Sequence, residues 1–116
     1  MQHRALQYLA DVREAIKLIQ RIAQGMTLEQ FMQNSTERLA VERLFEILGE
    51  AVSQLYRSDP PKAERITEYR RIISLRNILI HGYSQIDYDA LWAIIQTDLE
   101  PLRREIQRLL DEEGKS

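Results

Sequence analysis

Residues 35–57 read STERLAVERLFEILGEAVSQLYR and carry the clearest helical pattern of the chain. Apolar side chains recur every three or four positions on one arc, as in an amphipathic α-helix: Ala40, Leu44, Ile47, Leu48, Ala51, Val52 and Leu55. Polar side chains take the other side: Glu42, Arg43, Glu46, Glu50, Ser53 and Gln54. Asn34 and the two residues after it predict the start of this helix, and the Pro60-Pro61 pair predicts its end near Arg57. A long helix with one apolar face needs other helices to cover that face.

The segments before this one also predict helices. Apolar residues recur at the helical period over residues 4–24, and Gly25 suits the left-handed position that closes such a helix. Thr27 and Gln30 have the spacing of a capping box, which predicts a short helix over residues 28–32.

Two more helices are expected after the Pro60-Pro61 break. The first runs from the prolines to about His81, where Gly82 can supply a left-handed C-cap. The second begins after Asp87, because aspartate is a favourable N-cap residue.

The apolar positions of the last helix step by four, four, three, four and three residues: Leu91, Ile95, Leu99, Leu102, Ile106 and Leu109. Pro101 lies inside this pattern and is expected to kink the helix rather than end it, because the stripe continues beyond it. Residues 111–116 are polar and are expected to fray. The expected fold class is all-α, with residues 1–116 forming a single domain built as an antiparallel bundle of four to five helices.

Composition excludes several classes of protein. The chain has 116 residues, of which 44% are hydrophobic and 29% charged, as in ordinary globular proteins. It has no cysteine, which rules out disulfide scaffolds, cysteine-ligated metals and thiol nucleophiles. It also has no apolar stretch long enough to cross a membrane and no signal-peptide pattern, so a cytoplasmic protein that does not engage membranes is expected.

The charge of the chain is uneven. A formal net charge of −2 argues against a general basic surface for nucleic acids. Residues 57–76, however, carry 6 basic side chains against 3 acidic ones, and the basic ones are Arg57, Lys62, Arg65, Arg70, Arg71 and Arg76. Such a block is most often a solvated helix face, and the sequence that follows it decides whether it is more.

Residues 72–83 read IISLRNILIHGY and contain the residues suited to chemistry. On a helical wheel, Arg76 falls in the middle of an apolar arc, where a guanidinium is costly unless it is paired and hydrogen-bonded. Asn77 and His81 share a second face, and Ile78 makes a further side apolar. A helix with several apolar faces is usually packed on several faces, which predicts a subunit interface in addition to the core.

Arg76-Asn77, His81 and Tyr83 resemble the motif of the HEPN superfamily, and more closely that of its HepT toxins. The resemblance extends over about residues 4–107 and rests on these further segments: Tyr8-Leu9-Ala10-Asp11, Thr27-Leu28-Glu29-Gln30-Phe31, residues 40–51, and Asp87 followed by Leu91-Trp92 and Asp98-Leu99. There is one departure from the family pattern, a pair of residues: Glu68-Tyr69 stands where the family often has Pro-Trp.

The resemblance implies a metal-independent endoribonuclease that is active as a homodimer with the two motif helices facing each other. RNA supplies its own nucleophile, the 2′-hydroxyl, so the site needs proton transfer and phosphate stabilisation. His81 is suited to general acid–base catalysis and Arg76 to holding the scissile phosphate, with Asn77 orienting either group. Arg70 and Arg71 become candidates for RNA binding. Because Arg76 and His81 are about 140° apart around a straight helix, a two-fold dimer is expected to bring them together.

The resemblance also implies a regulator. HepT-like toxins are paired with a minimal nucleotidyltransferase antitoxin that transfers AMP to the motif tyrosine, which is Tyr83 here. A nucleotidyl group beside His81 and Arg76 would occupy the phosphate site and repel RNA. Neither a metal nor another cofactor is expected.

Three alternatives remain open at this stage. Glu50 is either a solvated residue of a polar helix face or the partner of an arginine in the dimer cleft. His81 and Tyr83 taken singly could be a helix-terminal histidine and a core-closing aromatic. The whole chain could be a non-catalytic helical dimer that binds and regulates a nucleotidyltransferase, or a plain four-helix interaction module.

Overall fold

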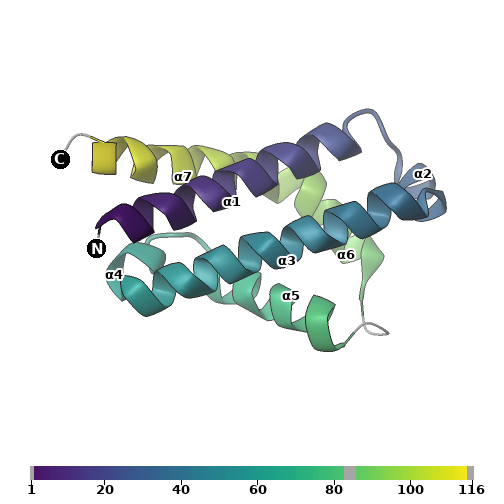
Figure 1. The fold of residues 1–116 in the computed structure, drawn as a ribbon. Helices are drawn as coiled ribbons and strands as arrows, with labels where there is room; N and C mark the ends of the chain where they lie inside the picture. The colour runs from purple at the N-terminus through teal and green to yellow at the C-terminus, as the bar shows by residue number, and fades with distance from the viewer. Residues whose placement is uncertain (1, 83–85, 115–116) are drawn as a thin grey trace.

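The computed structural model describes residues 2–82 and 86–114, and this part of the chain contains helices and no strands (Figure 1). The elements are α1 (Gln2–Ala23), α2 (Leu28–Gln33), α3 (Ser35–Ser58), α4 (Pro60–Ala63), α5 (Tyr69–His81), α6 (Tyr88–Ala93), the π-helical segment η2 (Ile94–Asp98) and α7 (Leu99–Gly114). The predicted all-α class is confirmed. Within the described residues, no helix is long and apolar enough to span a membrane.

The long helices lie side by side. Helix α1 packs against both α3 and α7, and α5 packs against α3 (Figure 1). Fully buried aliphatic side chains form the core between them: Leu9, Val12, Ile16, Ile19, Val41, Val52, Leu55 and Ile106. Each such side chain stabilises the fold by about 1.5–3 kcal/mol relative to its exposed state.

The local signals of the N-terminal part are confirmed. Gly25 has φ of 79°, the left-handed conformation expected at the end of α1. The Thr27 hydroxyl accepts a hydrogen bond from the Gln30 backbone N–H at 3.1 Å, and the Gln30 side chain accepts one from the Thr27 N–H at 3.0 Å. The capping box therefore starts α2 as predicted.

The buried face of α3 differs from the predicted one, most clearly at two positions. Glu42, predicted on the polar side, is only 3% exposed, and Ile47, predicted on the apolar side, is exposed. The Tyr88 hydroxyl donates a hydrogen bond to Glu42 Oε2 at 2.8 Å, and Arg38 Nε lies 3.8 Å from the same oxygen. Burial, and then the bond to Glu42, raises the pKa of Tyr88 above its ordinary value. The buried carboxylate of Glu42 is thus satisfied by two partners. A helical wheel of α3 can show Arg38 but not Tyr88, which belongs to another helix.

The segment between the prolines and α5 is not the continuous helix that was predicted. Helix α4 ends at Ala63, and α5 begins only at Tyr69, after Glu68 in a left-handed conformation with φ of 61°. The Thr67 backbone N–H and hydroxyl both donate to the carboxylate of Glu105 at 2.8 Å. This contact with α7 stabilises a turn where a helix was predicted.

The end of α5 also differs from the prediction. Gly82 has φ of −120°, so it is not in the left-handed region, and the predicted left-handed cap is wrong. Its N–H still donates to the Ile78 carbonyl at 2.8 Å, which closes the last turn of the helix. The glycine is therefore not required there by its backbone angle.

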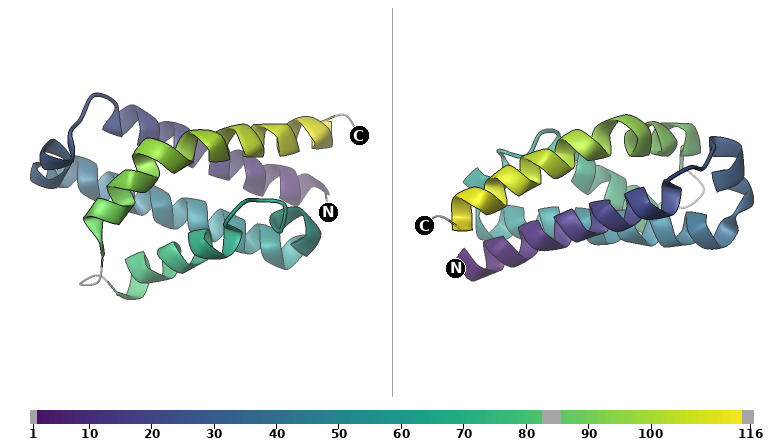
Figure 2. Two further views of the ribbon diagram at one scale, coloured as in Figure 1. Left: turned by 180° about the vertical axis from the view of Figure 1, so that it is seen from behind. Right: turned by 90° about the horizontal axis from the view of Figure 1, so that it is seen from above.

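The predicted kink near Pro101 is present, and it takes the form of a π-helical turn. Proline has no N–H to donate to the Thr97 carbonyl, and the Leu99 N–H reaches back to the Ile94 carbonyl, five residues earlier. The chain changes direction between α6 and α7 at this segment (Figure 2). The wide turn also explains how the two consecutive steps of four residues, from Leu91 through Ile95 to Leu99, all remain buried.

Helix α7 extends further than predicted. Residues 111–116 were expected to fray, but α7 runs through Gly114. Arg65 donates two hydrogen bonds of 2.7 Å to Glu112, and Lys62 pairs with Glu113. These charges connect the end of α7 to the segment before α5.

Candidate active site

The contact between α3 and α5 depends on a glycine. A Cβ atom placed on Gly49 would lie 2.3 Å from Arg76 Cβ, too short for any side chain, and in a tight contact of 3.2 Å with the Ile72 carbonyl oxygen. Gly49 is itself buried in α3. The two helices can therefore approach closely at the level of Arg76 only because residue 49 has no side chain.

Arg76 is held by groups from both helices. Its Nη2 lies 2.6 Å from Glu50 Oε1, and its Nη1 donates to Asn77 Oδ1 at 2.8 Å. Gln54 donates to the other oxygen of Glu50 at 2.8 Å, so the carboxylate is fixed on both sides. The guanidinium and the carboxylate are each partly buried. A guanidinium at an apolar position needs an ion-pair partner, and the partner of Arg76 is Glu50 of the same chain.

One nitrogen of Arg76 is left without a partner. Its Nε atom is buried and makes no hydrogen bond with any described residue. Buried donors are satisfied in the great majority of cases, and an exception calls for a structural or functional reason. Only the two terminal nitrogens of the guanidinium, Nη1 and Nη2, are bound, so the group can still rotate to present Nε to an incoming anion.

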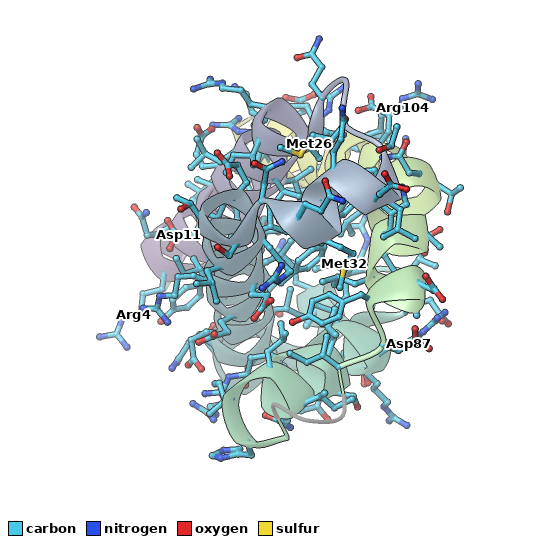
Figure 3. The ribbon with its side chains drawn as sticks, turned by 90° about the vertical axis from the view of Figure 1, so that its right-hand side faces the viewer. Arg4, Asp11, Met26, Met32, Asp87 and Arg104 are labelled. Atoms are coloured by element: carbon cyan, nitrogen blue, oxygen red, sulfur yellow. The ribbon has the colours of Figure 1, made fainter. Side chains whose placement is uncertain are left out.

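The head of Arg76 faces a shallow pocket of about 260 Å³ between α1, α3 and α5. Its lining combines acidic, basic and apolar side chains: Tyr8, Asp11, Arg43, Glu46, Ile47, Glu50, Ala51, Gln54, Arg76 and Ile80. Asp11 lies on the outer side of α1, well away from Asp87 at the start of α6 (Figure 3). Carboxylates outnumber guanidinium groups in this pocket, so a single chain does not by itself form a strongly positive phosphate site.

His81 is not part of this pocket. It is exposed in the last turn of α5, and Asn77, one turn earlier, is exposed as well. Among the described residues, Arg76 makes no hydrogen bond with His81, as expected from their separation around the helix. Tyr83 lies outside the described residues, so its prediction stays untested.

The two predicted RNA-binding arginines have different surroundings. Arg71 pairs with Glu68 at 3.2 Å and lines a second cavity on the other face of α5. Arg70 has no ion pair within the described part of the chain; its Nε donates to the Tyr69 hydroxyl at 3.0 Å. Arg70 is therefore the better placed of the two to bind an anion.

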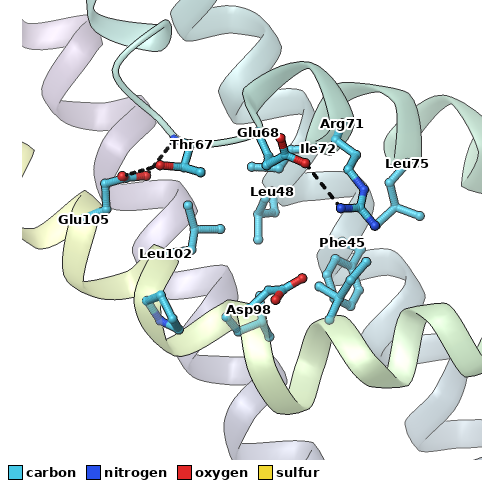
Figure 4. A pocket seen from close by; sticks show the side chains of 13 residues that line it. Phe45, Leu48, Thr67, Glu68, Arg71, Ile72, Leu75, Asp98, Leu102 and Glu105 are labelled. Atoms are coloured by element: carbon cyan, nitrogen blue, oxygen red, sulfur yellow. Dashed lines mark hydrogen bonds and ion pairs between the residues drawn. The ribbon is translucent and has the colours of Figure 1, made fainter.

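The second cavity, about 310 Å³ in volume, lies between α3, α5 and the η2–α7 bend (Figure 4). Its walls are mainly aliphatic and aromatic, and four polar groups on its rim pair with one another, Thr67 with Glu105 and Glu68 with Arg71. Of the motif residues that the structure describes, Arg76, Asn77 and His81, none lines it. Among the described residues, no group of three or more histidine, aspartate or glutamate side chains could hold a metal ion.

Sequence reasoning did not assign a role to Gly49 or to Tyr56, a residue of α3 that contacts the start of α5. Gly49 did carry a signal, because an isolated glycine inside a helical pattern usually has a packing reason. Nothing local marks Tyr56, whose ring partner Tyr69 belongs to another helix.

Comparison with known proteins agrees with these features. A family model described as Ribonuclease HepT-like matches residues 12–109. Similar proteins include "Putative RNase MJ1380" of Methanocaldococcus jannaschii, 32% identical over 86% of this chain and 91% of the relative. They also include "Probable ribonuclease HepT" of Thermococcus cleftensis, 31% identical over 88% of this chain and 92% of the relative. No solved structure matches the chain.

The chain therefore belongs to the HepT-like ribonuclease family. This confirms the resemblance that Arg76, Asn77, His81 and Tyr83 indicated.

Proposed function

We propose that the protein is a metal-independent endoribonuclease whose site is built around Arg76 and His81 and completed by a second copy of the chain. The observation that carries this proposal is the state of Arg76. Its guanidinium is partly buried, braced by Glu50 and Asn77, and has one buried N–H without a partner beside an open pocket. Such a group is prepared for an anion, and membership of a ribonuclease family makes an RNA phosphate the natural one.

The reaction needs only groups of the protein and of RNA. A base removes the proton of a 2′-hydroxyl, and the oxygen attacks the neighbouring phosphorus to form a 2′,3′-cyclic phosphate. The bond to the 5′-oxygen breaks, and an acid returns a proton to that oxygen. His81 takes the role of general acid or base, while Arg76 stabilises the added negative charge on the phosphate. Asn77 and Glu50 position Arg76.

A homodimer is proposed because one chain presents Arg76 and His81 on different faces of α5. Ile78 and Ile80 of the same helix are 38% and 39% exposed, and Ile47 of α3 is exposed nearby in the pocket lining. Exposed aliphatic residues on a motif helix favour burial against a second motif helix. Two-fold symmetry would then place His81 of one subunit opposite Arg76 of the other.

The test is to incubate the purified protein with RNA in the presence of EDTA. Cleavage is expected to continue, since the proposed chemistry uses no metal, and the products should end in a 2′,3′-cyclic phosphate and a 5′-hydroxyl. An RNA with a single 2′-deoxynucleotide at the cleaved position is the matched control and should remain intact there. A magnesium requirement, or products ending in a 3′-hydroxyl, would refute this mechanism. No cleavage of any RNA would favour the regulatory helical dimer instead.

We further propose that the protein is the toxin of a cytoplasmic toxin–antitoxin pair, controlled by AMP transfer to Tyr83 from a minimal nucleotidyltransferase. The added phosphate would place negative charge two residues from His81, where RNA phosphate has to bind. Mass spectrometry of the protein co-expressed with this transferase should locate AMP on Tyr83. Tyr83→Phe should retain RNA cleavage and escape neutralisation. AMP on Tyr69 or Tyr88, or full neutralisation of Tyr83→Phe, would count against this regulation.

A further inference from the structure

Two tyrosines and an arginine form a cluster at the start of α5. The rings of Tyr56 and Tyr69 are stacked, with centroids 5.6 Å apart and an interplanar angle of 20°. The Arg70 guanidinium lies 5.6 Å from the centroid of the Tyr69 ring, within the range of a cation–π interaction. Its hydrogen bond to the Tyr69 hydroxyl raises the pKa of Arg70 above its ordinary value. The cluster thus presents aromatic rings beside a permanent positive charge.

A purely structural role accounts for only part of this cluster. Tyr69 packs against the core, but Tyr56 remains 37% exposed although it is stacked. Arg70 is exposed, and the bond to Tyr69 uses one of the five N–H donors of its guanidinium. No described acid lies within ion-pair distance of Arg70, although the more distant Glu64 carboxylate helps to raise its pKa, so the other donors of the guanidinium are available to an anion.

The cluster lies on the same seam as Arg76. Tyr56 contacts Tyr69, and Gly49 contacts Arg76. Both pairs therefore lie in the same interface between the antiparallel helices α3 and α5, seven residues apart on each helix. Seven residues of helix separate the stack from Arg76 by about 10 Å. Four exposed polar residues of α5 share one face, at steps of four, three and four: Arg70, Ser74, Asn77 and His81. A continuous polar face therefore joins the cluster to His81.

We propose that Tyr56, Tyr69 and Arg70 form a stacking subsite for an unpaired base of the RNA substrate, a few nucleotides from the cleaved phosphodiester. An exposed aromatic ring offers a base a stacking surface whatever its identity, and the adjacent guanidinium can bind the phosphate of that nucleotide. The subsite requires single-stranded RNA, because a paired base cannot leave its own stack to lie on Tyr56. This inference rests on the proposed ribonuclease function and extends it to the substrate.

The test measures the affinity of RNAs that are lengthened one nucleotide at a time from either end of the cleaved dinucleotide, with a 2′-deoxynucleotide blocking cleavage. The wild-type protein should show one step of about 5- to 150-fold in Kd when the chain becomes long enough to reach the cluster. Tyr56→Leu, which keeps bulk but loses the ring, should lack this step. Tyr56→Phe should keep it.

An abasic nucleotide provides a control that needs no protein variant. When the abasic nucleotide replaces the one whose addition produced the step, the gain in wild-type affinity should disappear. Wild type and Tyr56→Leu should then bind this RNA with the same Kd. The shortest cleavable RNA should be cut with the same kcat/KM by all three proteins, which separates the subsite from the catalytic groups. If the wild-type protein cleaves RNA but Tyr56→Leu and the abasic RNA retain the step, the subsite is refuted and the ribonuclease function stands. If wild type neither binds nor cleaves RNA, both proposals fall.

Discussion

Replacing His81 by alanine is expected to lower the rate of RNA cleavage by about 10²- to 10⁴-fold, the range typical for loss of a general acid or base. The fold should be almost unaffected, because His81 is exposed and a charge at a helix end contributes only about 0.3–1 kcal/mol. Measuring kcat/KM on one RNA together with the thermal unfolding midpoint checks both parts. His81→Asn, which keeps polarity but cannot transfer a proton, should be equally slow.

Mixing two inactive variants tests whether the site is shared between subunits. After subunit exchange, a dimer of one Arg76→Ala chain and one His81→Ala chain retains an intact Arg76 in one subunit and an intact His81 in the other. The mixture should therefore cleave RNA well above either variant alone. If it does not, although exchange is verified by mass spectrometry, then Arg76 and His81 of opposite subunits do not cooperate. A protein that sediments only as a 13.7 kDa monomer would exclude the shared site directly.

Gly49→Ala is expected to destabilise the protein by about 1–3 kcal/mol, the usual cost of overpacking. The new Cβ would lie 2.3 Å from Arg76 Cβ, so α5 has to move away from α3. A movement of about 1 Å at Arg76 can lower catalysis by about 10²-fold, which adds a loss of activity to the loss of stability. Denaturant unfolding and the cleavage rate measure the two effects.

Gly114→Ala is the matched control for this change. Gly114 also lies in a helix, but nothing is found within 4 Å of the position that its Cβ would take. Alanine favours helix over glycine, so this variant should be as stable as wild type or slightly more stable, with unchanged cleavage. A Gly49→Ala protein that behaves like Gly114→Ala would show that the close approach of α3 and α5 is not needed.

The features that the sequence predicts well are those determined by neighbouring residues. The left-handed Gly25 and the capping box of Thr27 with Gln30 each depend on residues a few positions apart, and both are present. The unusual position of Arg76 among apolar residues also indicated that its guanidinium is paired, although the sequence did not identify the partner. Glu50 is that partner, and its assignment had stayed open because the wheel of one helix does not show the neighbouring helix.

The features that were missed depend on contacts between distant segments. Glu42 is buried because Tyr88, 46 residues away, donates to it. The start of α5 is delayed because Glu105, 38 residues from Thr67, binds the backbone of the preceding turn. Neither partner can be recognised from spacing along the chain, since a hydrophobic wheel reports only the average polarity of a face.

The π-helical turn before Pro101 constrains how many residues this part of the chain can have. If Ile94–Asp98 formed an ordinary α-helical ladder with the same number of residues, α6 would rotate by about 100° relative to α7, because the wide turn accommodates one extra residue. Trp92, whose ring lies 5.1 Å from that of Phe31, and the buried Leu91 would then turn away from the core. Deleting one residue from this segment should therefore leave α6 and α7 in register, whereas inserting one should disrupt the core, although most residues of the segment are exposed and lie outside any site.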